Sequence, residues 1–173
     1  MAWTSPYDNE PNWSLPYPIS PTPGSPVGEN PEELFEDLTR RLRVRFRFDR
    51  AVLILRSESE QHLLAVASHG GREGNRRLRL TLPTQNSLIA KVAEGGFPYT
   101  ESYCGFFSGN DLERGLLFDD RARAFAILPI KHDARVVGVL GFSAKDPEAF
   151  RLFEETDWPR LISPLSASIA NQR

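Results

Sequence analysis

Cysteine is nearly absent from this sequence. The chain of 173 residues has a single one, Cys104, so it can form neither an intrachain disulfide nor a zinc site built from several cysteines. Three roles stay open for Cys104: a small buried apolar residue, a redox-sensitive thiol, or one half of an intermolecular disulfide. Because nothing in the sequence points to an oxidising compartment, we expect a cytoplasmic protein.

Long apolar runs and an excess of one charge are also missing. No stretch approaches the roughly 18 apolar residues that span a bilayer, and the N-terminus lacks a basic segment followed by an apolar run. Lysine and arginine together number 21 against 23 for aspartate and glutamate, a net charge of −2. The chain as a whole therefore has no electrostatic reason to bind nucleic acid or an anionic membrane, and we expect neither as a partner.

Residues 1–29 differ in composition from the rest of the chain. They contain seven of the fourteen prolines and almost no aliphatic residues, so they can form neither a helix nor a central strand. Four aromatic residues recur in this stretch, namely Trp3, Tyr7, Trp13 and Tyr17. We predict an extended tail that precedes one domain at residues 30–173. The tail is either a segment that docks on a protein partner through its aromatic rings or a disordered segment with incidental aromatics.

An arginine-rich stretch, RRLRVRFRFDR, occupies residues 40–50 and has six arginines in eleven positions. Its alternation alone would indicate a strand with one basic face or a phosphate-binding stripe. However, Asn30 and Pro31 are typical of a helix start, and acidic residues follow them in the first turn. Because basic residues are favourable at the C-terminal end of a helix, the arginines about four turns later are typical of its last turns. We therefore predict a helix that begins at Pro31 and includes Arg40–Arg45, with Phe46 and Phe48 buried beneath the sheet. This placement spreads the arginines around the helix and disfavours phosphate binding.

The remaining pattern predicts a mixed α/β domain. Two apolar runs at 51–56 and 63–68 predict an antiparallel hairpin, and the strict alternation of RRLRLTLP predicts a strand with one solvated face. The later elements are a short helix capped by Thr84 or Asn86, a short strand near Tyr99, a long crossover at 103–122 with a helical turn near 112–117, strands at 123–130 and 135–144, and a last helix from about Asp157.

Three segments resemble one known family. They are RFDRAVLILRSESEQHLLAVASHG, RLRLTLPTQNSLIAKVAEGGFPYTES and AILPIKHDARVVGVLGFSAKDPEAF, and in this order they are similar to the GAF domain, a sensor and dimerisation module related to the PAS fold. The resemblance covers about residues 31–172. It implies an α+β fold in which a central antiparallel sheet has the N- and C-terminal helices on one face and a loop-rich crossover on the other.

The resemblance also implies a ligand pocket between the sheet and the crossover. The residues that would line it are Ser87, Tyr99, Tyr103, Cys104, Phe106, Phe107, Phe118 and Phe125. The same aromatic rings could instead fill this space, and both readings stay open. The cofactor is unknown, because we find no chromophore-binding context around Cys104, no cyclic-nucleotide signature and no phosphate loop. The three histidines are scattered, so no metal site is assigned, although FDDRAR with Cys104 leaves an iron site as an alternative.

We therefore expect a stand-alone, non-catalytic regulatory domain of signal transduction. Within the family, free methionine-sulfoxide reductase chemistry needs a nucleophilic and a resolving cysteine, and only Cys104 exists here. Because the sequence stops after the last predicted helix, we expect output through association instead of an attached kinase. Two hypotheses stay open: a small-molecule sensor beneath the 103–125 crossover, or a ligand-free scaffold subunit that docks through its tail. A homodimer through the terminal helices is expected in both cases.

Overall fold

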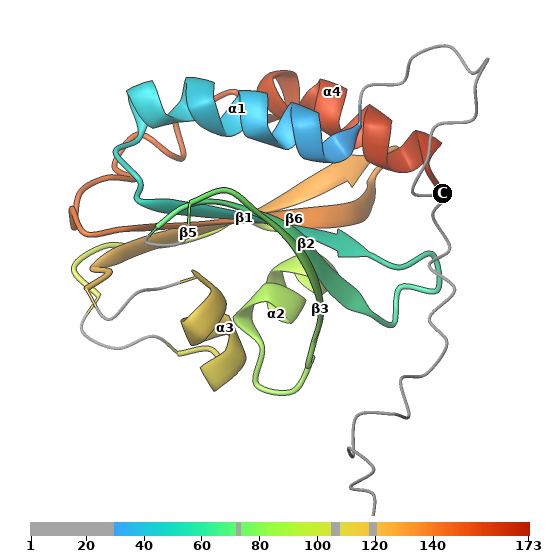
Figure 1. Cartoon of the computed structure of the whole chain (residues 1–173), viewed down its shortest axis with the longest axis horizontal. Coiled ribbons are helices and arrows are strands. Elements are labelled where there is room, and N and C mark those ends of the chain that lie inside the picture. The colour runs from blue at the N-terminus through green and yellow to red at the C-terminus, as the bar shows by residue number, and fades with distance from the viewer. Residues whose placement is uncertain (1–29, 72–73, 105–107, 118–120) are drawn as a thin grey trace, which may run out of the picture.

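The computed structural model of the chain describes residues 30–71, 74–104, 108–117 and 121–173 and is drawn in Figure 1. Its elements are α1 (Pro31–Arg45), β1 (Arg50–Arg56), β2 (Leu63–Gly70), β3 (Arg76–Leu82), α2 (Leu88–Gly95), β4 (Tyr99–Glu101), α3 (Asp111–Leu117), β5 (Ala124–His132), β6 (Arg135–Ala144) and α4 (Trp158–Asn171). The strands form one antiparallel sheet in the order β3-β2-β1-β6-β5-β4. The predicted α+β fold is confirmed. Among the described helices, none has both the length and the apolar character that a membrane-spanning segment requires.

Helix α1 begins and ends where the sequence pattern predicts. The side chain of Asn30 accepts a hydrogen bond from the backbone N–H of Glu32 at 3.2 Å, which satisfies one of the unpaired donors of the first turn. The helix ends at Arg45, and the two phenylalanines that follow, Phe46 and Phe48, are 2% and 3% exposed. The arginine-rich stretch is therefore a helix terminus followed by two buried anchors, as predicted.

One of these arginines also fixes the connection from α1 to β1. The guanidinium of Arg43 donates to the backbone oxygens of Phe48 at 3.4 Å and Asp49 at 3.0 Å. Gly70, at the end of β2, lies against the same backbone, and a Cβ atom there would be 2.3 Å from the oxygen of Asp49. Since Gly70 also has a φ of +82°, a glycine is required at this position.

The sheet is covered on both faces, as Figure 1 shows. Helices α1 and α4 lie side by side on one face, where a cluster of aromatic rings fills the core; its closest ring pair is Phe153 and Trp158, with centroids 4.6 Å apart. Helices α2 and α3 lie on the opposite face over a second apolar cluster. Because β1, β5 and β6 are buried from both sides, they read in the sequence as continuous apolar runs and not as alternating ones.

The two edges of the sheet differ. Strand β4 forms one edge with three residues, whereas β3 forms the other with seven. A β-bulge in β2 inserts Val66, because Leu53 of β1 pairs with Ala67 and Ile54 pairs with Ala65. The bulge leaves the alternation of β3 intact, so its leucines pack toward the α2 side of the sheet.

Candidate functional site

A carboxyl group is completely buried at the start of α2. Glu113, on α3, is 0% exposed, and its carboxylate accepts hydrogen bonds from the hydroxyl of Ser87, from the N–H of Leu88 at 3.0 Å and from the N–H of Ile89 at 3.1 Å. The Oγ of Ser87 in turn accepts from the N–H of Ala90 at 2.8 Å. The first N–H groups of α2, which have no partner within the helix, are therefore satisfied by two side chains, one of them from a different element.

Ser87, predicted to line a pocket, is thus the N-cap of α2. The prediction of a cap at Thr84 or Asn86 was wrong, and the backbone gives the reason. An N-cap needs an extended conformation, which Ser87 has with φ −93° and ψ 125°, whereas Asn86 has a φ of +52° in the left-handed region. Ser87 is 1% exposed, so its hydroxyl is available to the protein's own groups and not to bulk solvent.

Asn110 fastens the beginning of α3 to the loop that leads into α2. Its side-chain NH₂ donates to the oxygens of Pro83 and Gln85, both at 3.3 Å, and its oxygen accepts from the N–H of Glu113 at 2.9 Å. Asn110 therefore caps α3 and bridges it to the chain after β3. Together, Asn110 and Glu113 hold α3 beside α2. Figure 1 shows these two helices on the same face of the sheet.

Three more of the predicted pocket residues lie on this same side of the sheet. The ring of Tyr99 stacks on that of Phe125, with centroids 5.7 Å apart, and Phe125 is completely buried. The Tyr99 hydroxyl donates to Glu101 at 3.1 Å; burial raises the pKa of Tyr99, and the hydrogen bond to Glu101 raises it further. Cys104 is half-buried and packs against the same apolar cluster. The structure thus brings Ser87, Tyr99, Cys104 and Phe125 to the α2 and α3 face.

Tyr103 does not join this group. Its side chain is 61% exposed, and its hydroxyl donates to Glu148 at 2.7 Å, in the segment between β6 and α4. The other predicted pocket residues, Phe106, Phe107 and Phe118, lie outside the described residues, as do the tail aromatics. Within the described part of the chain, no group of three or more histidine, cysteine, aspartate or glutamate side chains is arranged to hold a metal ion.

The sequence reasoning missed Glu113 and Asn110, although a signal for them exists. Asn110 and Glu113 are spaced as N-x-x-E, the same pattern that starts α1 at Asn30. In a capping box the glutamate reaches back to its own helix. Here the asparagine caps α3, but the glutamate leaves its helix and caps α2 instead.

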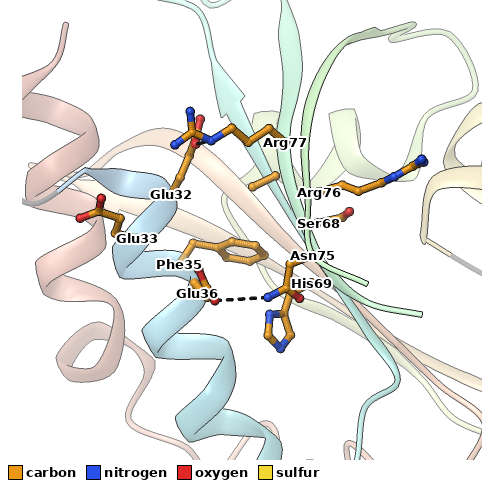
Figure 2. A pocket seen from close by; sticks show the side chains of 10 residues that line it. Glu32, Glu33, Phe35, Glu36, Ser68, His69, Asn75, Arg76 and Arg77 are labelled. Atoms are coloured by element: carbon orange, nitrogen blue, oxygen red, sulfur yellow. Dashed lines mark hydrogen bonds and ion pairs between the residues drawn. The ribbon is translucent and has the colours of Figure 1, made fainter. Parts of the chain in front are cut away.

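A groove lies on the opposite face of the sheet, between α1 and the β2–β3 edge (Figure 2). This groove has a volume of about 230 Å³, and Phe35 and Ala67 form its apolar part. Two contacts bridge it: the Nε of Arg77 lies 2.9 Å from a carboxylate oxygen of Glu32, and the Nδ2 of Asn75 donates to Glu36 at 3.2 Å. The groove is smaller than most ligand pockets, which hold about 300–1,000 Å³, and these two contacts already cross it.

His69 lines the same groove beside α1. Burial lowers the pKa of His69 and the positive charge of Arg43 lowers it further, while Glu36 acts in the opposite direction. The neutral imidazole is therefore favoured in the folded state. Because the unfolded chain binds the proton more readily, this histidine stabilises the fold above its ordinary pKa and loses that contribution as the pH falls.

Comparison with known proteins identifies the fold and the family. A family model described as GAF domain matches residues 30–172. The chain belongs to the GAF domain family. The GAF domain of a two-component sensor histidine kinase from Bacillus halodurans is 19% identical, with a TM-score of 0.66 over 81% of this chain and 93% of that chain. The GAF domain of a phosphoenolpyruvate-protein phosphotransferase from Coxiella burnetii is 20% identical, with a TM-score of 0.67 over 84% of this chain and 85% of that chain.

An enzyme shares the GAF fold as well. The type II free methionine-R-sulfoxide reductase from Thermoplasma acidophilum is 7% identical, with a TM-score of 0.59 over 82% of this chain and 94% of that chain. At such identities the likeness shows the fold alone. A search of curated proteins found no significant match.

Proposed function

We propose that this GAF domain is a non-catalytic regulatory domain of signal transduction that acts through protein association and through a small molecule bound beneath the 103–125 crossover. Membership of the family supports a regulatory role, as does the likeness to GAF domains of a sensor kinase and a phosphotransferase. The presence of Cys104 alone argues against the reductase chemistry, which uses a second thiol to resolve the oxidised one.

The buried Glu113 contact carries the sensing part of the proposal. It ties the position of α3 to the first turn of α2, so a displacement of α3 would leave the carboxylate of Glu113 and the N–H groups of that turn without their partners. An element with two distinct positions is what a ligand needs to shift a population. A molecule that contacts Tyr99 and Cys104 while α3 is docked would stabilise the docked position.

The sensing proposal predicts that one compound of a metabolite collection raises the melting temperature of the full chain in a saturable manner. At a concentration of about 100 times its Kd, a ligand stabilises the folded state by about 2.7 kcal/mol. The Cys104→Ala variant should weaken this compound severalfold, because Cys104 lies on the α2 and α3 face. The control variant Tyr103→Ala should bind it as the natural chain does, because Tyr103 is exposed. A screen in which no compound shifts the melting temperature would contradict ligand sensing.

Association is proposed through the outer side of the terminal helices and through the tail aromatics Trp3, Tyr7, Trp13 and Tyr17. On α1, acidic residues occupy the first turns and arginines the last ones, and Val44 is 89% exposed between these arginines. Two copies of α1 packed antiparallel about a two-fold axis would bring each acidic half against a basic half. This charge order supports a homodimer with Val44 at its contact.

The dimer proposal predicts the effect of a single charge. Sedimentation of the full chain is expected to give a dimer, and Val44→Glu should weaken its self-association about tenfold or more by placing an unpaired carboxylate in the contact. The matched control is Arg151→Glu, at an exposed position between β6 and α4. A chain that sediments as a monomer at all concentrations, or a dimer indifferent to Val44→Glu, would contradict this interface.

A further inference from the structure

We propose that the outer edge of β3 is a docking site for an extended peptide segment of a partner protein, in which acidic side chains alternate with apolar ones. In the described part of the chain, β3 pairs with β2 alone. Every second residue of an edge strand directs its backbone N–H and C=O outward, where an added strand can pair with them. The seven residues of β3 contain no proline, so each of them has a backbone N–H group.

The length of β3 distinguishes it from a protected edge. Proteins commonly blunt an edge by keeping the strand short or by interrupting it with a bulge or proline. The opposite edge of this sheet follows that practice, since β4 has three residues. On the β3 side, the ladder with β2 has an irregularity, since Ala67 pairs with Arg77 and Ala65 with Leu80, but β3 continues through it for seven residues and keeps its alternating faces.

The side chains of β3 present a different chemistry on each face. Arg77 lies on the α1 side, where it contacts Glu32, and by alternation Arg79 lies on that side as well. Leu78 and Leu80 pack partly against the α2-side core and remain half-exposed. A strand added at this edge would place one set of its side chains beside the arginines and the other beside the leucines, and such cross-strand pairs are what stabilise a sheet.

The charge of β3 selects the occupant. The strand carries three arginines, Arg76, Arg77 and Arg79, and no acidic residue. A second copy of β3 would bring arginines next to arginines, which is unfavourable. A segment with glutamate or aspartate at alternate positions would instead place these acids beside Arg77 and Arg79, which share one face of the strand. The Nε of Arg77 already contacts Glu32 at 2.9 Å, so a carboxylate of the added strand would meet the terminal nitrogens of Arg77.

The test uses the full chain and a labelled synthetic peptide of about nine residues that alternates glutamate and valine. Fluorescence anisotropy should detect binding that weakens as salt is added, and hydrogen exchange of the β3 amides should slow. Arg77→Glu with Arg79→Glu should weaken binding by about tenfold or more. Lys145→Glu with Arg151→Glu, which changes two exposed basic residues between β6 and α4, should leave it unaltered.

Two further peptides separate strand pairing from simple charge attraction. A peptide with the same side chains but with alternate backbone nitrogens methylated keeps its charge and cannot form the ladder, so it should not bind; a lysine and valine peptide should not bind either. Equal binding of the methylated peptide, or no binding of the acidic one, would overturn the proposal. Loss of self-association in the Arg77→Glu, Arg79→Glu variant would also overturn it, because the occupant of the β3 edge would then be a second copy of the chain. A dimer broken by Val44→Glu alone bears on the proposed α1 interface and not on this edge.

Discussion

Replacement of Glu113 by alanine is expected to lower the free energy of unfolding by about 3–4 kcal/mol, which corresponds to a melting temperature lower by roughly 10 °C. The carboxylate of Glu113 accepts from Ser87, Leu88 and Ile89 in a site without solvent access. Alanine would leave two backbone N–H groups of α2 and one hydroxyl without an acceptor. Each unsatisfied buried donor costs about 1–3 kcal/mol, reduced where water can enter.

The Glu113→Ala variant should lose stability at the first turn of α2 in addition to its lower overall free energy of unfolding. Hydrogen exchange of the Leu88 and Ile89 amides should become faster in the Glu113→Ala variant, because those amides donate to Glu113 in the natural chain. The exposed Asp111, on the same helix, is the matched control: Asp111→Ala removes a contact to Arg114 in which the aspartate side chain is 98% exposed. Such surface pairs contribute about 0–1 kcal/mol, so the control should unfold almost as the natural chain does.

A double-mutant cycle measures the link between the two helices. Ser87→Ala alone should cost about 0.5–2 kcal/mol as the loss of an N-cap. Since Ser87 and Glu113 share one contact, the double variant should be less destabilised than the sum of the single ones. Strict additivity, or a Glu113→Ala variant as stable as the control, would contradict the view that Glu113 holds α3 to α2.

The sequence alone predicted the helices and strands that are determined by residues close to one another in the chain. The Asn30 cap and the acidic-to-basic order fixed both ends of α1, and this resolved the alternating arginines in favour of a helix. The two-residue period of β3 and the apolar runs of β1 and β6 likewise predicted strands in their places. In each case the pattern reflects which side of the element meets the core, and that information lies within a few residues.

The candidate site depends on contacts between distant parts of the chain, and local patterns could not supply them. Ser87 and Glu113 are 26 positions apart, and nothing in the N-x-x-E spacing reveals that Glu113 caps another helix. The cap of α2 was misplaced for a related reason: Asn86 is as good a capping residue as Ser87 by propensity, and only the turn geometry decides between them. Tyr103, close in sequence to Cys104, turns toward Glu148 because of its positive φ of 55°.

Gly138, in the V-G-V-L stretch on which the family resemblance partly rests, is expected to tolerate no larger residue. It lies in β6 opposite Leu55 of β1, at the centre of the sheet. A Cβ atom at this position would be 2.7 Å from the backbone oxygen of Ile54 and 3.4 Å from the Cδ1 of Ile130. The first neighbour is backbone in a central strand and cannot move aside, so Gly138→Ala should destabilise the domain by about 2–3 kcal/mol and Gly138→Val by more.

Gly115 is the control that separates the steric effect at Gly138 from the general effect of replacing a glycine. It lies in α3, and a Cβ atom there would meet nothing within 4 Å. Because alanine favours the helix over glycine, Gly115→Ala should be neutral or should stabilise the domain by up to about 1 kcal/mol in the same denaturation experiment. If both substitutions had similar effects, backbone entropy and not the contact with Ile54 would explain the glycine of β6. If they differ in sign, the glycine is present because the backbone of β1 at Ile54 lies too close for a side chain at this position of β6.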